Sequence, residues 1–188
     1  MKIFKGLIAA ALSCALSLSL FSVSKAAKTD TDTAETVDAV SEEPAAADSV
    51  PIYRRYNPGN GEHFYTTNKT EADSLVTVHG WSDEGIGWYA PKLKADRGDP
   101  VYRFYNPILG VHRYTADKTE REALLRYGWN AEGILCYSKK TGGTPVFRLK
   151  NPNNEQENFT LDPAEAVMNI RAGWLNEPYT FFAVKIEK

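Results

Sequence analysis

The stretch Pro100-Val-Tyr-Arg-Phe-Tyr-Asn-Pro107 decides the fold, because the chain contains it three times. The first copy is Pro51-Ile-Tyr-Arg-Arg-Tyr-Asn-Pro58, and the third is Pro145-Val-Phe-Arg-Leu-Lys-Asn-Pro152. The copies begin 49 and 45 residues apart. A fixed period in this range indicates a repeat architecture, in which each unit completes its core against its neighbours.

Each copy continues with the same further motifs, which are clearest in the second copy. The returning segment Gly110-Val-His-Arg-Tyr-Thr115 follows the Asn-Pro turn and predicts a hairpin of two short strands. Asp117-Lys-Thr-Glu120 has the spacing of a capping box and predicts a helix that ends at Gly128. A closing strand is expected over Ile134–Ser138, and over Ile86–Ala90 and Tyr179–Val184 in the other copies.

Each unit therefore has the predicted order strand, strand, helix and then one or two strands. One such unit cannot bury its own aromatic face, whereas three units around a common axis can. We predict a mostly β domain with three short helices, arranged as a pseudo-threefold, β-trefoil-like domain of three repeats at 51–99, 100–144 and 145–188. The alternative is a three-bladed radial arrangement.

The first fifty residues have a different composition. Residues 1–26 resemble a secretory signal peptide, with Lys2 and Lys5 before an apolar run and small residues at Ser24 and Ala26. An uncleaved membrane anchor and a lipid anchor at Cys14 are the alternatives. Residues 27–50 contain seven acidic residues, one lysine and no aromatic residue, which predicts a disordered acidic linker.

Charge and cysteine content exclude several classes of function. The whole chain has 22 Lys plus Arg and 24 Asp plus Glu, so it has no basic field for nucleic acid, and no membrane contact is expected after signal cleavage. Only Cys136 remains in the mature chain, where we expect it to be a small buried hydrophobic residue. We expect a secreted, extracellular monomer.

The strings P-V-Y-R-x-Y-N-P, G-x-H-x-Y-T and G-W-x-x-E-G-I resemble an extracellular repeat family of bacteria and fungi whose function is not established. Its copies are often appended to secreted peptidases, glycoside hydrolases and cell-wall proteins. The resemblance covers essentially all of 51–188 and implies a non-catalytic binding module. The third copy departs from the pattern, with Lys150 for the tyrosine, Glu157 for the histidine and Pro178 for the glycine.

Three residue types recur at fixed places in all three copies, including the divergent third one. Arginine and glutamate can pair as a partly buried clamp within each unit, and a tryptophan after each helix can pack as a core wedge. Acid–base glutamates and a surface platform of tryptophans are the alternatives. We assign a structural role to Arg54, Glu84, Arg103, Glu132, Arg148, Glu177, Trp81, Trp129 and Trp174.

Histidines are the candidates for metal binding or catalysis, but only His63, His79 and His112 are present. A zinc site needs three or four protein ligands, and the chain has neither a cysteine cluster nor a His-Glu-x-x-His motif. We therefore predict no metal, no cofactor and no catalytic residues.

The remaining candidates lie near the predicted hairpin tips of the first two copies. Aromatic rings offer apolar faces to sugar C–H groups, while Asn and His donate and accept hydrogen bonds. The alternative is that the tyrosines are core residues and the asparagines form turns. The predicted ligand-binding residues are Tyr56, Asn57, His63, Tyr105, Asn106 and His112.

These features predict a secreted, non-catalytic module that binds carbohydrate or a cell-wall polysaccharide. A protein-interaction or adhesion module at the cell surface is the alternative, and a hydrolase is a third. Because the third copy has Lys150, Glu155 and Glu157 at the hairpin positions, this hypothesis expects ligand binding by the first two copies only.

Overall fold

The computed structural model describes residues 48–179 and 181–185, all of them within one unit, Ser41–Lys188. The predicted signal peptide, 1–26, and residues 27–47 of the predicted linker lie outside the described residues. The first strand begins at Ser49, two residues before the expected start of the domain.

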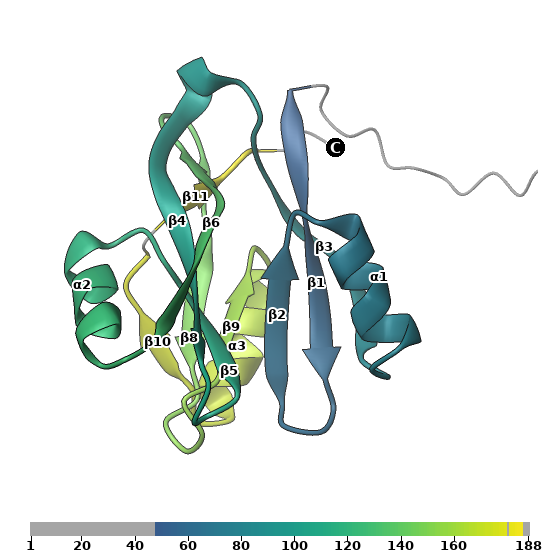
Figure 1. Cartoon of the computed structure of the whole chain (residues 1–188). Coiled ribbons are helices and arrows are strands. Elements are labelled where there is room, and N and C mark those ends of the chain that lie inside the picture. Colours follow the sequence, from purple (N-terminus) through teal and green to yellow (C-terminus); the bar gives the residue numbers. More distant parts are fainter. Residues whose placement is uncertain (1–47, 180, 186–188) are drawn as a thin grey trace, which may run out of the picture. The chain divides into compact units, whose positions relative to one another are not determined.

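The described chain contains three units with the same order of elements (Figure 1). The first consists of β1 (Ser49–Asn57), β2 (Glu62–Thr66), α1 (Lys69–Thr77) and β3 (Ser82–Pro91). The second consists of β4 (Arg97–Asn106), β5 (Val111–Thr115), α2 (Lys118–Arg126) and β6 (Asn130–Lys139). The third consists of β8 (Phe147–Lys150), β9 (Glu157–Thr160), α3 (Pro163–Arg171) and β10 (Leu175–Glu177). The short elements η1 (Lys94–Asp96), β7 (Thr144–Pro145) and β11 (Phe182–Ala183) complete the described fold.

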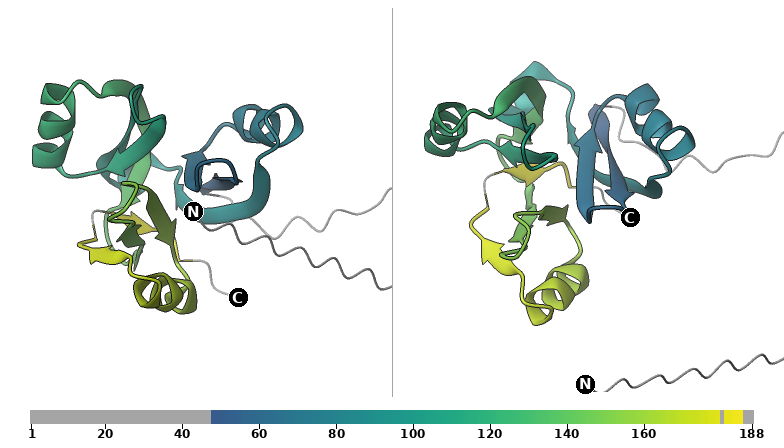
Figure 2. Two further views of the ribbon diagram at one scale, coloured as in Figure 1. Left: turned by 90° about the horizontal axis from the view of Figure 1, so that it is seen from below. Right: turned by 60° about the horizontal axis from the view of Figure 1, so that its bottom comes forward.

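Each unit has its own three-stranded antiparallel sheet, in which the first strand of the unit lies in the centre. The orders are β2-β1-β3, β5-β4-β6 and β9-β8-β10, and β7 pairs with β11. Figure 2 shows the three sheets around a shared centre with the three helices at the periphery. The structure therefore confirms a mostly β fold with three helices. No helix within the described residues has the length and hydropathy that a transmembrane span requires.

The three hairpins form as the sequence indicates, and their turns have the same backbone conformation. Gly61 and Gly110 have positive φ angles of 82° and 68°. Glu155, at the equivalent place in the third unit, also has a positive φ, 62°. A non-glycine residue pays a steric penalty in this region, so the third turn keeps the shape of the other two at some cost in strain.

Three aromatic rings from the second strand of each unit meet at the centre of the core. Tyr65, Tyr114 and Phe159 are each at most 1% exposed. Their ring centroids lie 5.3, 5.6 and 5.9 Å apart with interplanar angles of 85° to 89°, which is the favoured edge-to-face geometry. Each pair joins two units, so the units share one core. Trp88 and Phe181 pack around these rings.

The tryptophans that follow the helices contribute less to the core than the sequence suggested. Trp129 is buried, 8% exposed, in a small cluster beside the main core. Trp81 and Trp174 are only half-buried. The expectation of one buried wedge per unit is thus met by Trp129 alone. Cys136 is buried as expected, and burial raises its pKa to about 12.

Candidate functional site

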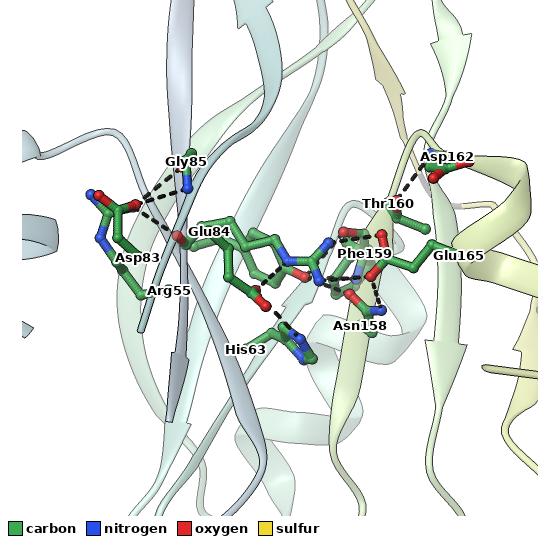
Figure 3. A network of polar contacts seen from close by, with 12 residues as sticks. Arg55, His63, Asp83, Glu84, Gly85, Asn158, Phe159, Thr160, Asp162 and Glu165 are labelled. Atoms are coloured by element: carbon green, nitrogen blue, oxygen red, sulfur yellow. Dashed lines mark hydrogen bonds and ion pairs between the residues drawn. The ribbon is translucent and has the colours of Figure 1, made fainter. Parts of the chain in front are cut away.

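The arginine in the central strand of each unit lies between two carboxylates from different units. In the first unit, Arg54 donates from Nε to Glu84 Oε2 at 2.7 Å. Its two terminal nitrogens donate to both oxygens of Glu165, at 2.6 and 3.0 Å (Figure 3). Glu84 belongs to β3 of the same unit, whereas Glu165 lies in the first turn of α3 in the third unit. We call this arrangement a clamp.

The same clamp recurs in the other units. Arg103 lies 2.8 Å from Glu132 of its own unit and donates to both oxygens of Glu71 in α1, at 3.1 and 3.2 Å. Arg148 donates to both oxygens of Glu120 in α2, at 2.6 and 2.7 Å. The arginines thus join the first unit to the third, the second to the first and the third to the second. Such two-pronged, charge-assisted pairs are both strong and directional.

The helix glutamates are held in their ionised form. Burial is the largest single influence on the pKa of Glu71, Glu120 and Glu165 and would raise it, but the hydrogen bonds and charge of the paired arginine, together with other hydrogen bonds, outweigh burial and lower the pKa. The pKa of Glu165 falls to about 2, because Thr160 and Asn158 also donate to it. These carboxylates are suited to fixed electrostatic contacts between units rather than to proton donation.

The helix caps confirm half of the predicted capping box. Asn68 accepts hydrogen bonds from Thr70 N and Glu71 N, and Asp117 and Asp162 cap their helices similarly. The glutamate does not complete the box, since Thr66 Oγ1 accepts the hydrogen bond from Asn68 N. The sequence predicts a local cap at this position, but the main partner of the glutamate is an arginine from a neighbouring unit. In the sequence, this role is indicated by the glutamate that all three copies retain at this position.

The third unit has a different clamp, and the predicted pair of Arg148 with Glu177 does not form in it. Arg148 Nε donates instead to Glu157 Oε1 at 3.0 Å. Glu157 replaces the histidine of the other two copies and is buried in β9. Burial raises the pKa of Glu157, and the neighbouring Arg148 and Arg113 oppose this rise.

The backbone at Glu177 differs from that at its equivalents, although β10 still pairs Glu177 with Arg148 in the antiparallel register. Glu84 and Glu132 precede glycines with positive φ angles, 73° at Gly85 and 100° at Gly133, where the pairing register shifts. Pro178 occupies this place in the third unit, and proline holds φ near −65°. The bulge is therefore impossible, β10 ends at Glu177, and the predicted strand Tyr179–Val184 is reduced to β11.

The six predicted ligand-binding residues fall into two groups. Tyr56 lies beside His63 with ring centroids 5.0 Å apart, and Tyr105 lies beside His112 at 4.9 Å. The structure therefore brings each tyrosine and histidine together. Asn57 Oδ1 accepts from Gly59 N, and Asn106 Oδ1 accepts from the amides of Ile108 and Leu109, so both asparagines stabilise hairpin turns.

Both histidines lie beside a clamp. His63 Nε2 is 3.5 Å from Glu84 Oε2, and its side chain is 11% exposed. Burial, helped by the charge of Arg54, lowers the pKa of His63 to about 4. His112 Nδ1 lies 2.7 Å from Glu62 Oε1. These contacts support a structural role for the rings, because little of either one is available to a ligand.

Among the described residues, pockets lie at two of the clamps where neighbouring units meet. The smaller, of about 230 Å³, includes Asn68, Glu71, Arg103 and Glu132 between the first and second units. The larger, of about 500 Å³, lies between the second and third units, and we call it the 2–3 pocket. None of the six predicted ligand-binding residues lines either pocket. The 2–3 pocket is lined by residues that include Arg113, Asp117, Glu120, Arg148, Glu177 and Tyr179.

Sequence reasoning missed most of the 2–3 pocket. It named Arg148 and Glu177 as structural residues, and it did not single out Arg113 or Tyr179. These residues come from two units and are brought together only by the packing of one unit on the next. Among the residues that the structure describes, no group of three or more His, Cys, Asp or Glu side chains is placed to hold a metal ion.

The comparisons with other proteins concern the whole repeat domain. The family model described as Domain of unknown function (DUF5648) matches residues 35–184. A comparison with curated proteins finds no match, and a comparison with solved structures finds none either. The matched residues include all three units, the clamps and the 2–3 pocket. Because this match covers well over half of the 188 residues, the chain belongs to the DUF5648 family of domains of unknown function.

Proposed function

We propose that this protein is a secreted, non-catalytic binding module for carbohydrate or a cell-wall polysaccharide, and that its ligand occupies the 2–3 pocket. We further infer that the three units are related by a pseudo-threefold axis, in the three-bladed radial arrangement. Two observations favour that arrangement over a closed trefoil barrel. The arginine contacts link the units in a cycle, and each unit has its own separate three-stranded sheet.

The 2–3 pocket is the observation that carries the binding proposal. Its volume, about 500 Å³, lies in the range of small-ligand sites. One wall presents Tyr179, whose residue is 47% exposed, and the other walls present charged side chains. An accessible ring beside fixed hydrogen-bonding groups suits a sugar, which has an apolar C–H face and a rim of hydroxyl groups.

A hydrolytic function is less well supported by this geometry. Glycoside hydrolysis typically uses two carboxyl groups, one of which must act as an acid. In the 2–3 pocket, Glu120 is held ionised by Arg148, and Asp117 Oδ1 accepts a hydrogen bond as the helix cap. Glu120 and Asp117 are therefore suited to positioning a ligand, whereas Asp99 and Glu177, the other two carboxyl groups of the pocket, have no ion pair among the described residues. A hydrolase therefore remains only the third hypothesis.

A protein-interaction or adhesion module is the second candidate. Exposed apolar side chains gather in α3 and β10, where Val167, Met168, Ile170 and Leu175 are 44% to 69% exposed. Large exposed apolar patches mark protein-binding surfaces. This surface lies on the third unit, so the two candidate functions can be separated by substitutions that affect one surface and spare the other.

The test is a glycan array, together with sedimentation on isolated peptidoglycan, using the intact mature chain. The proposal expects binding that Tyr179→Ala weakens at least tenfold. The matched control is Met168→Ala on the apolar surface, which should leave glycan binding unchanged. Absence of binding to every glycan and to peptidoglycan, with the chain folded, would overturn the carbohydrate proposal and favour the adhesion module.

A further inference from the structure

We propose that the 2–3 pocket selects an amino sugar, a hydroxylated ring that bears a protonated amine, and that Glu177 recognises the amine. This inference rests on the proposed function and specifies its ligand class. It also reverses the expectation from the sequence, because the divergent third unit then supplies the binding site instead of lacking one. Three observations carry it: a carboxylate without an ion pair among the described residues, a charge balance and an exposed ring.

The first observation concerns the carboxylate of Glu177, a residue that lies opposite Arg148 in the strand pairing. Its equivalents are both engaged, Glu84 by Arg54 at 2.7 Å and Glu132 by Arg103 at 2.8 Å. Within the described residues, the Glu177 carboxylate makes no hydrogen bond or ion pair, and it lines the 2–3 pocket. Two substitutions release it. Pro178 prevents the backbone bulge, and Glu157 takes the arginine that the glutamate would bind.

The second observation is that every cation at the 2–3 pocket is already neutralised. Arg148 pairs with Glu120 and Glu157. Arg113 and Lys150 both pair with Glu155, at 2.6 and 2.8 Å.

The uncompensated charge in the pocket is therefore negative. It comes from Glu177, Asp99 and Asp117, which all line the pocket and have no ion pair among the described residues, Asp117 being also the cap of α2. A ligand with a positive charge is favoured over a neutral or acidic one.

The third observation is the ring of Tyr179, which follows Glu177 by two residues. Phe147 packs against it with centroids 5.6 Å apart, so the ring is held in place from one side. A ring held near a carboxylate can contact the C–H face of a sugar while the carboxylate binds a substituent. A charged hydrogen bond of this kind contributes about tenfold or more in affinity.

The smaller pocket, between the first and second units, is a matched site within the same molecule. Like the 2–3 pocket, it lies beside a clamp where two units meet. It differs in that Glu132 is paired with Arg103 there, and its volume is about 230 Å³ instead of about 500 Å³. The difference between the two pockets follows from the third copy's own substitutions. Glu132 is accordingly the control position for Glu177.

The experiment compares three oligosaccharides with the same β-1,4 linkage and length. They differ only at C2 of the sugar, where glucosamine has an amine, N-acetylglucosamine an acetamide and glucose a hydroxyl. Affinities are measured by calorimetry with the intact mature chain at mildly acidic pH, where the amine is protonated. The inference expects the glucosamine oligomer to bind about tenfold or more tightly than the other two.

Two variants locate the effect. Glu177→Gln should remove the preference for the amine, reducing affinity for the glucosamine oligomer about tenfold with little change in melting temperature. Glu132→Gln should lower the melting temperature and leave the preference intact, because that carboxylate pairs with Arg103.

The outcomes separate this inference from the proposed function. Equal affinity for the three oligomers, or a preference that survives Glu177→Gln, would overturn the amino-sugar site and leave carbohydrate binding intact. Absence of binding to any oligomer or glycan would overturn both. Competition by a linear diamine as effective as the oligomer would show recognition of charge alone, and the amino-sugar inference would be wrong.

Discussion

Arg103 of the second unit donates to both carboxylate oxygens of Glu71, which lies in the first turn of the helix of the first unit. The contact joins residues 32 positions apart and repeats with the same geometry between the other units. A residue that the sequence presents as part of a helix cap is therefore the link between two units. The clamps and the three central rings together make the units one cooperative structure.

Removal of the charge of Glu71 should destabilise the domain. Glu71→Gln leaves Arg103 partly buried with one carboxylate fewer, and we expect a loss of about 1–3 kcal/mol in the free energy of unfolding. Denaturation in urea measures it. The control is Lys69→Gln, which breaks the exposed pair with Asp73 and should change stability by less than about 0.5 kcal/mol. Equal effects of the two variants would show that the clamp is no stronger than a surface ion pair.

Glu165 should contribute to acid denaturation. Its pKa is about 2 in the folded protein against an ordinary value of 4.5. A carboxyl group with a lowered folded pKa stabilises the protein above its unfolded pKa, and this stabilisation is lost as the pH falls from about 4.5 to about 2. Glu165→Gln should therefore be less stable than the parent at neutral pH, with a difference that shrinks across that window. A difference that stays constant with pH would contradict the assignment.

Phe159 should contribute more to the stability of the fold than Trp174, for which the sequence predicts a role as a core wedge. Phe159 is fully buried between Tyr65 and Tyr114, so Phe159→Ala should cost about 3–5 kcal/mol or prevent folding. Phe159→Leu, which keeps most of the volume, should fold and cost less. Trp174 is half-buried, so Trp174→Ala should cost less than Phe159→Ala. Thermal unfolding of the three variants measures their loss of stability. A larger loss for Trp174→Ala than for Phe159→Ala would show that the core does not centre on Phe159.

Substitution of the two histidines should affect stability rather than binding. His63 and His112 have side chains 11% and 15% exposed and lie beside the clamps. The double variant His63→Ala with His112→Ala should lower the melting temperature and retain glycan affinity per folded molecule. Loss of binding with an unchanged melting temperature would return the ligand site to the hairpin tips.

Local features of the sequence predicted the fold well. The alternating aromatic residues, the Asn-Pro turns and the glycines after each helix predicted the three hairpins and three helices, because those signals act over a few residues. The arrangement of strands into separate sheets did not follow, since it depends on contacts between units. The sequence places Tyr65 in a strand motif but does not predict that its ring packs against Tyr114 of the second unit.

The candidate site was harder to predict for the same reason. A pocket formed by two units has no continuous signature in the sequence, and Tyr179 follows the last recognisable motif. In the sequence, Glu157 and Pro178 indicate only that the third copy has lost the histidine and the glycine of the repeat pattern. In the structure they act together, since one occupies Arg148 and the other redirects Glu177. Only the geometry connects two changes that lie 21 residues apart.

A nuclear magnetic resonance titration can establish whether the ligand binds in the 2–3 pocket. Backbone amide shifts of the intact chain are followed as the glucosamine oligomer is added. We expect the largest changes at the 2–3 pocket, at Asp117, Glu177 and Tyr179, with small changes at Asn57 and Asn106 in the hairpin turns. Largest changes at the two hairpin turns, or none anywhere at saturating oligomer, would contradict it.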